Sequence, residues 1–395
     1  MPEHHLISTI VGAIVAAAIF GYLAQKMRLP ALVGYLIAGV LIGPYTPGFV
    51  ADTKLAKQLA EIGIILLMFG VGLHFSVDDL RKVQRIALPG ALFQMFCAIA
   101  LGAVTGVIAG FPLVHSIIFG LALSVASTVV LLRTLSEYHL QDSPAGKLAI
   151  GWLIVEDILM VLAIVLLPVL AGMLSAEQGI DLKKIGTELA GVLLKIGGFV
   201  TLMILFGRRF LPSILQKVAN IGSHELLTLC TLAVALGFAY LAFSAFDASF
   251  ALGAFFAGLV LNESRIGQDS AATTQTLRDT FAVLFFVSVG MLLDPMTLLR
   301  QPFMVLATVL IIVVGKALAA WIILRLFQQP RETGVLTALG LAQIGEFSFI
   351  LAGMGLTLEV LSMELYNLIL AGALIAIAMN PLLFHINRRF LPQGS

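Results

Sequence analysis

The chain has 395 residues, of which 60% are hydrophobic and only 11% are charged. Soluble domains carry about 25% charged residues, so this composition excludes a soluble protein and predicts an integral membrane protein with many spans. A formal net charge of +1 without any basic run indicates no nucleic-acid partner. Cys97 and Cys230 lie in separate apolar stretches without CxxC spacing, so neither a disulfide nor a metal site is predicted from them.

We predict an all-α membrane protein with thirteen transmembrane helices. The N-terminal residues MPEHH contain no Lys or Arg and the first span has no A-x-A cleavage site, so a retained helix is favoured over a signal peptide. The second, ninth and tenth spans are short. The predicted spans are approximately 6–25, 30–44, 55–74, 86–110, 115–134, 147–171, 186–208, 223–243, 248–262, 279–293, 302–325, 333–356 and 364–387.

The loop charges predict the orientation of these spans. Alternate loops place sixteen Lys and Arg residues on one side of the membrane. The other side has five, namely Lys54, Lys57, Lys183, Lys184 and Arg300. By the positive-inside rule, the N-terminus lies outside and the C-terminus in the cytoplasm. The expected location is the bacterial inner membrane, which the chain crosses many times.

Two pairs of spans resemble each other at nearly one spacing. LVGYLIAGVLIG from Leu32 matches ALGAFFAGLVLN from Ala251 at an offset of 219, with small residues in register. LLMFGVGL from Leu66 matches LFFVSVGM from Leu284 at an offset of 218. Seven spans separate the partners, so the two halves have opposite orientation. This pattern predicts two inverted-topology six-helix repeats linked by the seventh span, an arrangement typical of alternating-access transporters.

The span 147–171 contains two adjacent acids, Glu156 and Asp157. Placing one acid at the centre of a membrane helix costs about 2.5–3.5 kcal/mol, so two in succession require a reason. Neighbouring helical residues point about 100° apart, so the two acids face different neighbours. They could form a structural ion-pair anchor, but intramembrane acids favour a carrier of protons or cations, and we adopt that interpretation.

Two further spans carry polar residues at mid-membrane. The fifth contains Ser124, Ser127 and Thr128, and its counterpart by repeat position, the twelfth, contains Gln343 and Glu346. Unwound carbonyls and hydroxyls can coordinate a cation, so both helices are predicted to be broken around one site. The alternative for the hydroxyls is an ordinary hydrogen bond to a carbonyl of the preceding turn.

Glycines and a lysine accompany these polar residues. Gly340 and Gly345 would allow the twelfth span to unwind. Lys316 lies deep in the eleventh span and is the natural basic partner for one acid. It could exchange its pairing during transport or form a permanent salt bridge. Lys195, in the seventh span, is assigned a snorkelling or structural role.

These segments together resemble the monovalent cation:proton antiporter superfamily, in particular its second, Kef-type family. The resemblance covers essentially all thirteen spans. It rests on GYLIAGVLIGP, SVASTVVLL, the acid-Asp pair and QIGEFSF, which occur in family order, while IGWLIVED is most similar to the YbaL-like branch.

The resemblance implies roles for the candidate residues. Asp157 is the expected carrier of the proton and cation, and Glu156, Ser127 and Thr128 are the other expected cation- or proton-binding residues. The monovalent cation itself is expected at Asp157, Thr128 and Ser127. Glu156 stands where relatives have Asp, Asn or Gln. The expected supporting residues are Lys316, Glu346, Gln343 and Ser124. Ile344 replaces a glycine of the family motif.

The resemblance also implies an architecture and partners. Residues 1–390 are expected to form the transmembrane antiporter domain. Spans 1–3 and 8–10 form a dimerisation panel, and spans 4–6 and 11–13 form a core that slides against it like an elevator. A homodimer in the lipid bilayer is expected. The full-length protein should add a cytoplasmic nucleotide-binding regulatory domain, which this chain lacks. Residues 391–395 are interpreted as a tail whose Gly-Ser end is typical of a cloning remnant.

Three functions compete. The first is secondary exchange of a monovalent cation, K⁺ favoured over Na⁺, for protons, with no other cofactor and no enzymatic activity. The second is a gated cation channel or leak pathway, which the inverted repeat and the lack of a TVGYG-like filter disfavour. The third is a membrane sensor without transport, which the occupied site positions disfavour.

Overall fold

The structure of the protein is a computed structural model. It describes residues 5–47, 50–74, 77–140, 143–174, 191, 194–195, 197–246, 250–262 and 265–387. Every regular element within these ranges is helical, which confirms the predicted all-α class. The beginning of the predicted seventh span and the predicted tail 391–395 lie outside the described residues.

The chain divides into two compact units. Unit one comprises Met1–Ile14, Ala51–Phe75 and Val165–Ser288, and unit two comprises Val15–Val50, Ser76–Ile164 and Val289–Ser395. Helices α1, α7 and α12 therefore each belong partly to both units. The predicted dimerisation panel and core, which were assigned by whole spans, stay a prediction.

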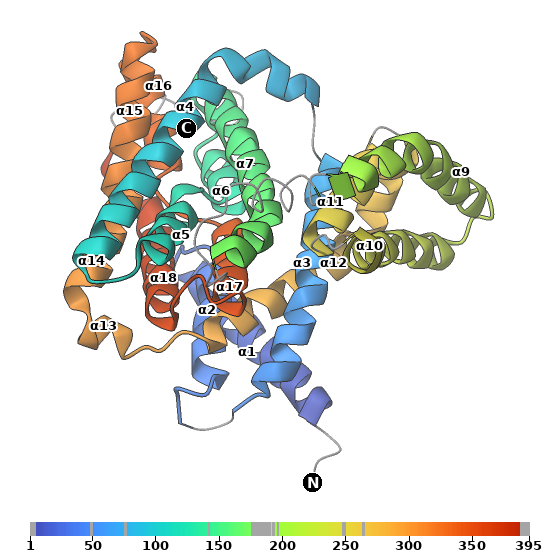
Figure 1. The fold of residues 1–395 in the computed structure, drawn as a ribbon, viewed down its shortest axis with the longest axis horizontal. Helices are drawn as coiled ribbons and strands as arrows, with labels where there is room; N and C mark the ends of the chain where they lie inside the picture. Colours follow the sequence, from blue (N-terminus) through green and yellow to red (C-terminus); the bar gives the residue numbers. More distant parts are fainter. Residues whose placement is uncertain are drawn as a thin grey trace. The chain divides into compact units, whose positions relative to one another are not determined.

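Unit two contains the elements that carry the candidate residues. In Figure 1, α4–α7 run from cyan to green and α14–α18 from orange to red. Among its contacts, α4 packs on α5 and α15, and α18 packs on α14 and α17. Its elements are α2 (Ala31–Ile42), α4 (Val77–Ile108), α5 (Leu113–Ser124), α6 (Thr128–Glu137), most of α7 (Pro144–Leu174), α13 (Thr297–Arg300), α14 (Pro302–Leu310), η2 (Ile311–Gly315), α15 (Lys316–Leu326), α16 (Arg331–Gly340), α17 (Glu346–Thr357) and α18 (Met363–Ile386).

Unit one is built around the packing of α3 on α11, and α11 also packs on α10. Its elements are α3 (Thr53–His74), η1 (Met203–Gly207), α9 (Arg208–Ala219), α10 (His224–Phe246), α11 (Phe250–Asn262) and most of α12 (Arg265–Met291), with the start of α1 (His5–Lys26).

Seven described helices are long and apolar enough to cross a membrane, and an eighth span is possible if the bent pair Gly197–Gly207 and Arg209–Ala219 counts as one. Shorter apolar helices occur at Ala31–Ile42, Leu113–Ser124, Phe250–Asn262 and Glu346–Thr357. The first and third of these are the short second and ninth spans of the sequence prediction. The total of thirteen spans stays a prediction.

Glycines allow two helix crossings that use equivalent positions of the sequence repeat. In unit one, a Cβ on Gly72 would meet the Phe255 carbonyl and the Cα of Gly258. In unit two, a Cβ on Gly290 would meet the Leu36 carbonyl and the Cα of Gly39. Gly72 and Gly290 are related by the offset of 218, and Gly39 and Gly258 by the offset of 219. The small residues that revealed the repeat are therefore those that let backbones touch.

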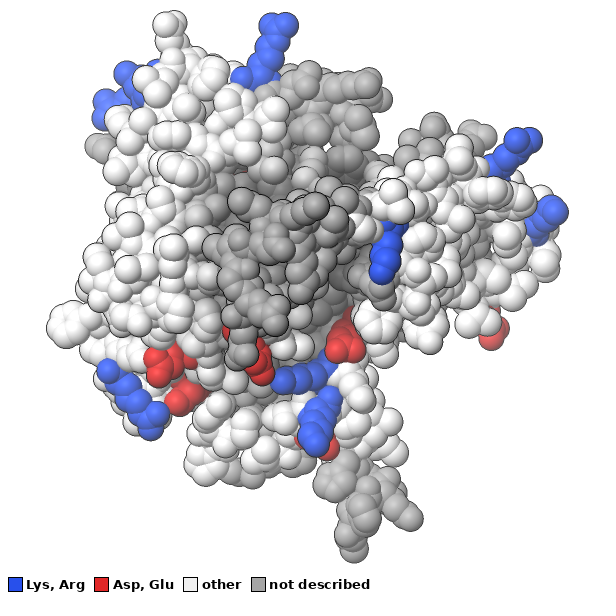
Figure 2. Space-filling model, viewed as in Figure 1, with Lys and Arg blue, Asp and Glu red and all other residues white. Residues whose placement is uncertain are grey.

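The described surface is largely apolar. Many large hydrophobic side chains are exposed, including Ile108, Phe303 and Leu194 at 80%, 85% and 79%. On the face in Figure 2, uncharged residues cover most of the described surface. Exposed apolar surface on this scale fits a protein whose solvent is lipid.

Candidate functional site

The predicted break in the fifth span is confirmed. Helix α5 ends at Ser124, the backbone is extended from Val125 (φ −102°, ψ 135°), and α6 begins at Thr128. A break removes helical hydrogen bonds, and backbone groups without partners are costly inside a bilayer. Side chains replace them here, because Glu156 Oε2 accepts a hydrogen bond from the Ala126 amide at 2.8 Å.

The twelfth span is broken as well, between the end of α16 at Gly340 and the start of α17 at Glu346. The side chain of Gln343 connects the two breaks. Its Oε1 accepts from the Ser127 amide at 2.8 Å and its Nε2 donates to the Ser127 carbonyl at 3.1 Å. The Gln343 amide thus pairs with the Ser127 backbone in both directions, as a neighbouring strand would.

A glycine is needed at position 345 because a side chain would clash there, and not because of an unusual backbone conformation. Its φ of −121° and ψ of −173° are extended values that any residue adopts. A Cβ at Gly345, however, would lie 2.6 Å from the Cα of Ser127 and 3.0 Å from the Ala126 carbonyl oxygen. The twelfth span is unwound at Gly345, as predicted, and the structure adds a steric reason for the glycine, because two backbones touch there.

The two adjacent acids have different partners, as their 100° separation predicts. Glu156 is fully buried, and its second oxygen, Oε1, has no hydrogen-bond partner. Asp157 Oδ2 accepts from Thr128 Oγ1 at 3.1 Å, while its buried Oδ1 has no partner. Glu346 is the third buried acid, and its Oε2 accepts from Ser127 at the first break. Three carboxyl groups therefore lie at the two helix breaks.

Lys316 is fully buried, but its described contact differs from the predicted ion pair. Its Nζ donates a hydrogen bond to the Gln343 carbonyl at 2.7 Å. Among the described residues, no contact of 4.0 Å or less joins Lys316 to an acid. Lys316 and Glu156 are both buried and hold backbone groups of different breaks, the lysine the Gln343 carbonyl and the acid the Ala126 amide. The π-helical turn η2 directly precedes this lysine, and such turns frequently occur at functional sites.

The remaining predicted residues separate into two groups. Ser127 Oγ donates to Glu346 Oε2 at 3.3 Å, and Glu346 lies in the first turn of α17, where the helix dipole favours negative charge. Ser124 Oγ instead donates to the Leu121 carbonyl at 2.7 Å, so its proton is directed back into its own helix. The structure therefore brings Ser127, Thr128, Glu156 and Asp157 together with Gln343, Glu346 and Lys316, and leaves the Ser124 hydroxyl outside this group.

Sequence reasoning missed the fully buried residues Gln94 and Trp152. Gln94 Nε2 donates to the Ser124 carbonyl at 2.9 Å, and its Oε1 accepts from Trp152 Nε1 at 3.2 Å. A lone glutamine in the apolar run ALFQMFCAIA was the available signal. A polar side chain at mid-span has to find a partner, and a broken helix offers one.

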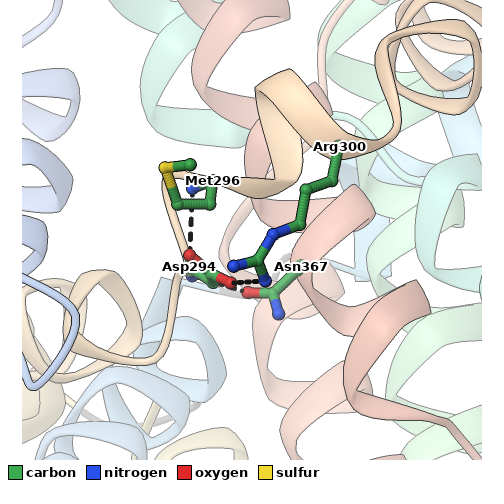
Figure 3. Close-up of polar contacts among 4 residues, drawn as sticks. All are labelled: Asp294, Met296, Arg300 and Asn367. Carbon is green, nitrogen blue, oxygen red and sulfur yellow. Dashed lines mark hydrogen bonds and ion pairs between the residues drawn. The ribbon is translucent and has the colours of Figure 1, made fainter.

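A cavity of about 230 Å³ elsewhere in unit two contains none of the candidate residues. Asp294 forms one wall, where its Oδ1 accepts from the Met296 amide at 2.9 Å and its Oδ2 lies 3.4 Å from Arg300 Nη1. Asn367 accepts from the Asp294 amide at 2.9 Å (Figure 3). These contacts connect the α12–α13 link to α18, and they are separate from the residues around the helix breaks.

The family is shown by comparison with known proteins. Residues 14–386 match the family model described as sodium/hydrogen exchanger, transmembrane. The chain belongs to this family. It is 55% identical over 394 residues to "Putative cation/proton antiporter YbaL" of Escherichia coli (strain K12), and the match covers 99% of this chain and 70% of YbaL. It is 32% identical over 383 residues to K(+) efflux antiporter 4 of Arabidopsis thaliana, covering 96% of this chain and 64% of the relative.

A solved structure supports the same fold for this exchanger-family chain. The sodium proton antiporter MjNhaP1 of Methanocaldococcus jannaschii at pH 8 aligns over 100% of both chains with a TM-score of 0.75 at 16% identity. The resemblance to the Kef-type antiporters predicted from the motifs is confirmed by these relatives, which are named as transporters rather than enzymes. The chain is therefore a multi-pass membrane protein with the antiporter fold.

Proposed function

We propose that the protein exchanges a monovalent cation for protons across the membrane, with Asp157 binding each in turn. The observation that carries this proposal is the environment of one carboxylate. Its Oδ2 is held by Thr128, its Oδ1 is buried without a partner, and Glu156 and Glu346 are the other acids at the same two breaks. Either a proton or a cation would neutralise this carboxylate. A carboxylate that cannot hold both at once couples their movements.

The surrounding residues supply the rest of a cation site. Carboxylate, hydroxyl and carbonyl oxygens are the ligands that alkali cations prefer, and both helix breaks present such groups. The hydroxyl of Thr128 contacts Asp157 directly. The hydroxyl of Ser127 contacts Glu346 instead, at the same pair of breaks. Lys316 and Gln343 support the second break. We assign Asp157, Thr128 and Ser127 to the cation and Glu156 to the electrostatic setting of the site.

K⁺ is favoured over Na⁺ as the exchanged cation. The Arabidopsis relatives are named K(+) efflux antiporters, although MjNhaP1, of similar fold, is named a sodium proton antiporter. We further propose thirteen spans in two inverted repeats, elevator-type movement in a homodimer, and residence in a bacterial inner membrane with the N-terminus outside. The matching glycine crossings support the repeat, and the loop charges support the orientation.

A gated cation channel is the second candidate, since it could use the same polar centre. The two functions differ in coupling. An antiporter moves protons when a cation gradient is imposed, and its rate saturates. A channel gives cation conductance that does not require a proton gradient.

The test uses purified protein in proteoliposomes that contain a pH-sensitive dye. Imposed K⁺ and Na⁺ gradients should each be tried, and competition between them ranks the cations. Asp157→Asn keeps the volume but removes the ionisable group, so it should abolish cation-driven proton movement in a folded protein. Asp294→Asn, in the same unit but away from the breaks, is the matched control and should retain exchange. Undiminished exchange in Asp157→Asn would overturn the assignment of the carrier.

A further inference from the structure

Gln94, on α4, links two elements of the site by hydrogen bonds that are all buried. Its Nε2 donates to the Ser124 carbonyl at the end of α5 at 2.9 Å. Its Oε1 accepts from Trp152 Nε1, one helical turn before Glu156 on α7, at 3.2 Å. The indole nitrogen can only donate, so it fixes the direction of the glutamine amide. The NH₂ group must then face Ser124.

Trp152 is itself fixed in place by packing. It is fully buried in the hydrophobic cluster of unit two, and its ring fills the space above Gly90, where any Cβ would clash with it. Gly90 lies one turn before Gln94 on the same face of α4. The glycine thus admits the ring, and the ring's N–H reaches the glutamine. Gln94 has been given no role in the cation site described above.

The carbonyl that Gln94 holds is one of those that the helix break leaves without a helical partner. In a continuous helix, the Ser124 carbonyl would accept the amide of Thr128, four residues later. The extended segment after Ser124 removes that bond, and a membrane interior offers no water in its place. Glu156 meanwhile holds the Ala126 amide from the α7 side. The break is therefore held on one side by Gln94 and on the other by Glu156.

We propose that Gln94 is a positioning residue for the cation site, oriented by Trp152, and that it sets where Thr128 stands relative to Asp157. The inference rests on the proposed exchange function and extends it to a residue whose hydrogen bonds go to none of the three carboxyl groups of the site. Loss of the Gln94 bond frees the end of α5, so the segment from Ser124 to Thr128 gains alternative positions. The cation then meets a less ordered ligand set, and its apparent affinity falls while the carrier itself is intact.

The test compares substitutions that remove different parts of this link. Gln94→Leu removes both hydrogen bonds at similar volume. Gln94→Glu keeps an acceptor for Trp152 but loses the amide donor to Ser124. Trp152→Phe retains a ring above Gly90 but loses the N–H that orients the glutamine. Each is assayed in proteoliposomes for the cation KM and the maximal rate of cation-driven proton movement.

We expect Gln94→Leu to raise the cation KM about tenfold, with less than a threefold change in maximal rate, because displaced ligands weaken binding before they stop turnover. Trp152→Phe should raise KM by a smaller factor. The double variant should resemble Gln94→Leu alone, since the tryptophan acts through the glutamine. If Gln94→Leu does not fold, the other two variants carry the same comparison.

Asn367→Leu is the matched control for simple loss of stability. Asn367 is likewise nearly buried and forms a link between elements in unit two, but it bonds the Asp294 amide away from the breaks (Figure 3). It should lower the melting temperature as Gln94→Leu does and leave the cation KM unchanged. A spectroscopic reading is independent of transport. With Trp321→Phe in place, Trp152 is the remaining tryptophan of two, and its emission should shift when Gln94→Leu removes its acceptor.

The outcomes separate this inference from the proposed function. If the wild-type protein shows no coupled proton movement, the exchange function fails. If the wild-type protein exchanges and Gln94→Leu keeps a wild-type cation KM, the positioning role fails while exchange stands. Equal KM increases in Gln94→Leu and Asn367→Leu would also overturn the inference, because general loosening would then explain both.

Discussion

Ser127 Oγ donates a hydrogen bond to Glu346 Oε2 at 3.3 Å, and the two residues are 219 positions apart. This separation equals the offset that relates the glycine-rich spans of the two halves. In the proposed repeat these would be corresponding positions, and their side chains meet at the two helix breaks. The contact also separates Ser127 from Thr128, because Thr128 bonds Asp157 and Ser127 bonds a different acid.

The first prediction follows from that division of partners. Thr128→Ala should raise the apparent cation KM about tenfold or more, because hydrogen bonds to charged groups contribute about 1.5–3 kcal/mol. Ser127→Ala should raise it by a smaller factor, since its hydroxyl acts through Glu346. The main effect of each change should be on the cation KM rather than on the pH optimum, because hydroxyls do not titrate in this range.

The measurement is the dependence of the proton flux on cation concentration in proteoliposomes. Thr128→Ser keeps a hydroxyl at the same atom and serves as the control, so it should stay near the wild-type KM. Equal KM values for wild-type protein, Ser127→Ala and Thr128→Ala would show that both hydroxyls have only a structural role.

The sequence was sufficient to predict the all-α class, the two helix breaks and the segments that surround the site. The breaks were predictable because hydroxyls, glycines and acids at mid-membrane are costly unless the backbone or a partner uses them. Such arguments depend on residue type and depth, which the sequence contains. The grouping of Thr128 with Asp157 came from the family resemblance, and their side chains are in hydrogen-bond contact.

The partners within the site could not be predicted in the same way. Beyond a break, side-chain direction depends on the backbone angles of residues such as Val125 and Gly345 rather than on helical periodicity. Lys316 was expected to pair with an acid, but a broken helix also exposes carbonyls, and Gln343 provides one. Carbonyls are present at every residue, so the sequence does not indicate which are free. The same limit concealed Gln94 and its bond to Ser124.

The second prediction concerns the closeness of the two breaks. Gly345→Ala places a Cβ 2.6 Å from the Cα of Ser127, and neither backbone can yield easily. Overpacking of this kind costs about 1–3 kcal/mol, so the melting temperature and the exchange rate should both fall. Gly353→Ala is the control on the same helix, because its Cβ meets nothing within 4 Å. The free energy of unfolding of Gly353→Ala should stay within about 1 kcal/mol of wild type, because replacing a helical glycine by alanine changes stability by no more than that. If both variants had the same melting temperature, the close contact between the Gly345 and Ser127 backbones would be contradicted.

The third prediction concerns Glu156 as a backbone partner. Glu156→Gln keeps a side-chain oxygen that can accept the Ala126 amide, so the folded protein and its exchange should survive. Glu156→Leu removes the acceptor and leaves that amide without a partner, which costs about 1–3 kcal/mol. Melting temperatures of the two variants give the comparison, and a Gln variant as unstable as the Leu variant would contradict it. Proton flux with and without a clamped potential then shows whether removing the Glu156 charge alters the charge moved per turnover.

The last prediction joins Glu156 to Lys316 through their charges rather than through a direct contact. Lys316 Nζ holds the Gln343 carbonyl, and we expect its charge to act as well on Glu156, another buried ionisable group of the site. Losing one member of a buried charge pair can cost about 3–5 kcal/mol, because the other charge is left alone in a medium of low polarity. Lys316→Met, which keeps the apolar stem, should therefore lower the melting temperature strongly.

Adding Glu156→Gln to Lys316→Met should restore part of that loss and not all of it. The second change removes the isolated charge of Glu156, but it cannot replace the hydrogen bond from the lysine to Gln343. Melting temperatures of the wild type, both single variants and the double variant measure the coupling. Additive losses would show that the two charges do not act on each other. Complete recovery would show instead that the bond to the Gln343 carbonyl contributes nothing to stability, and the second helix break would then have to be held by the Gln343 side chain on Ser127 alone.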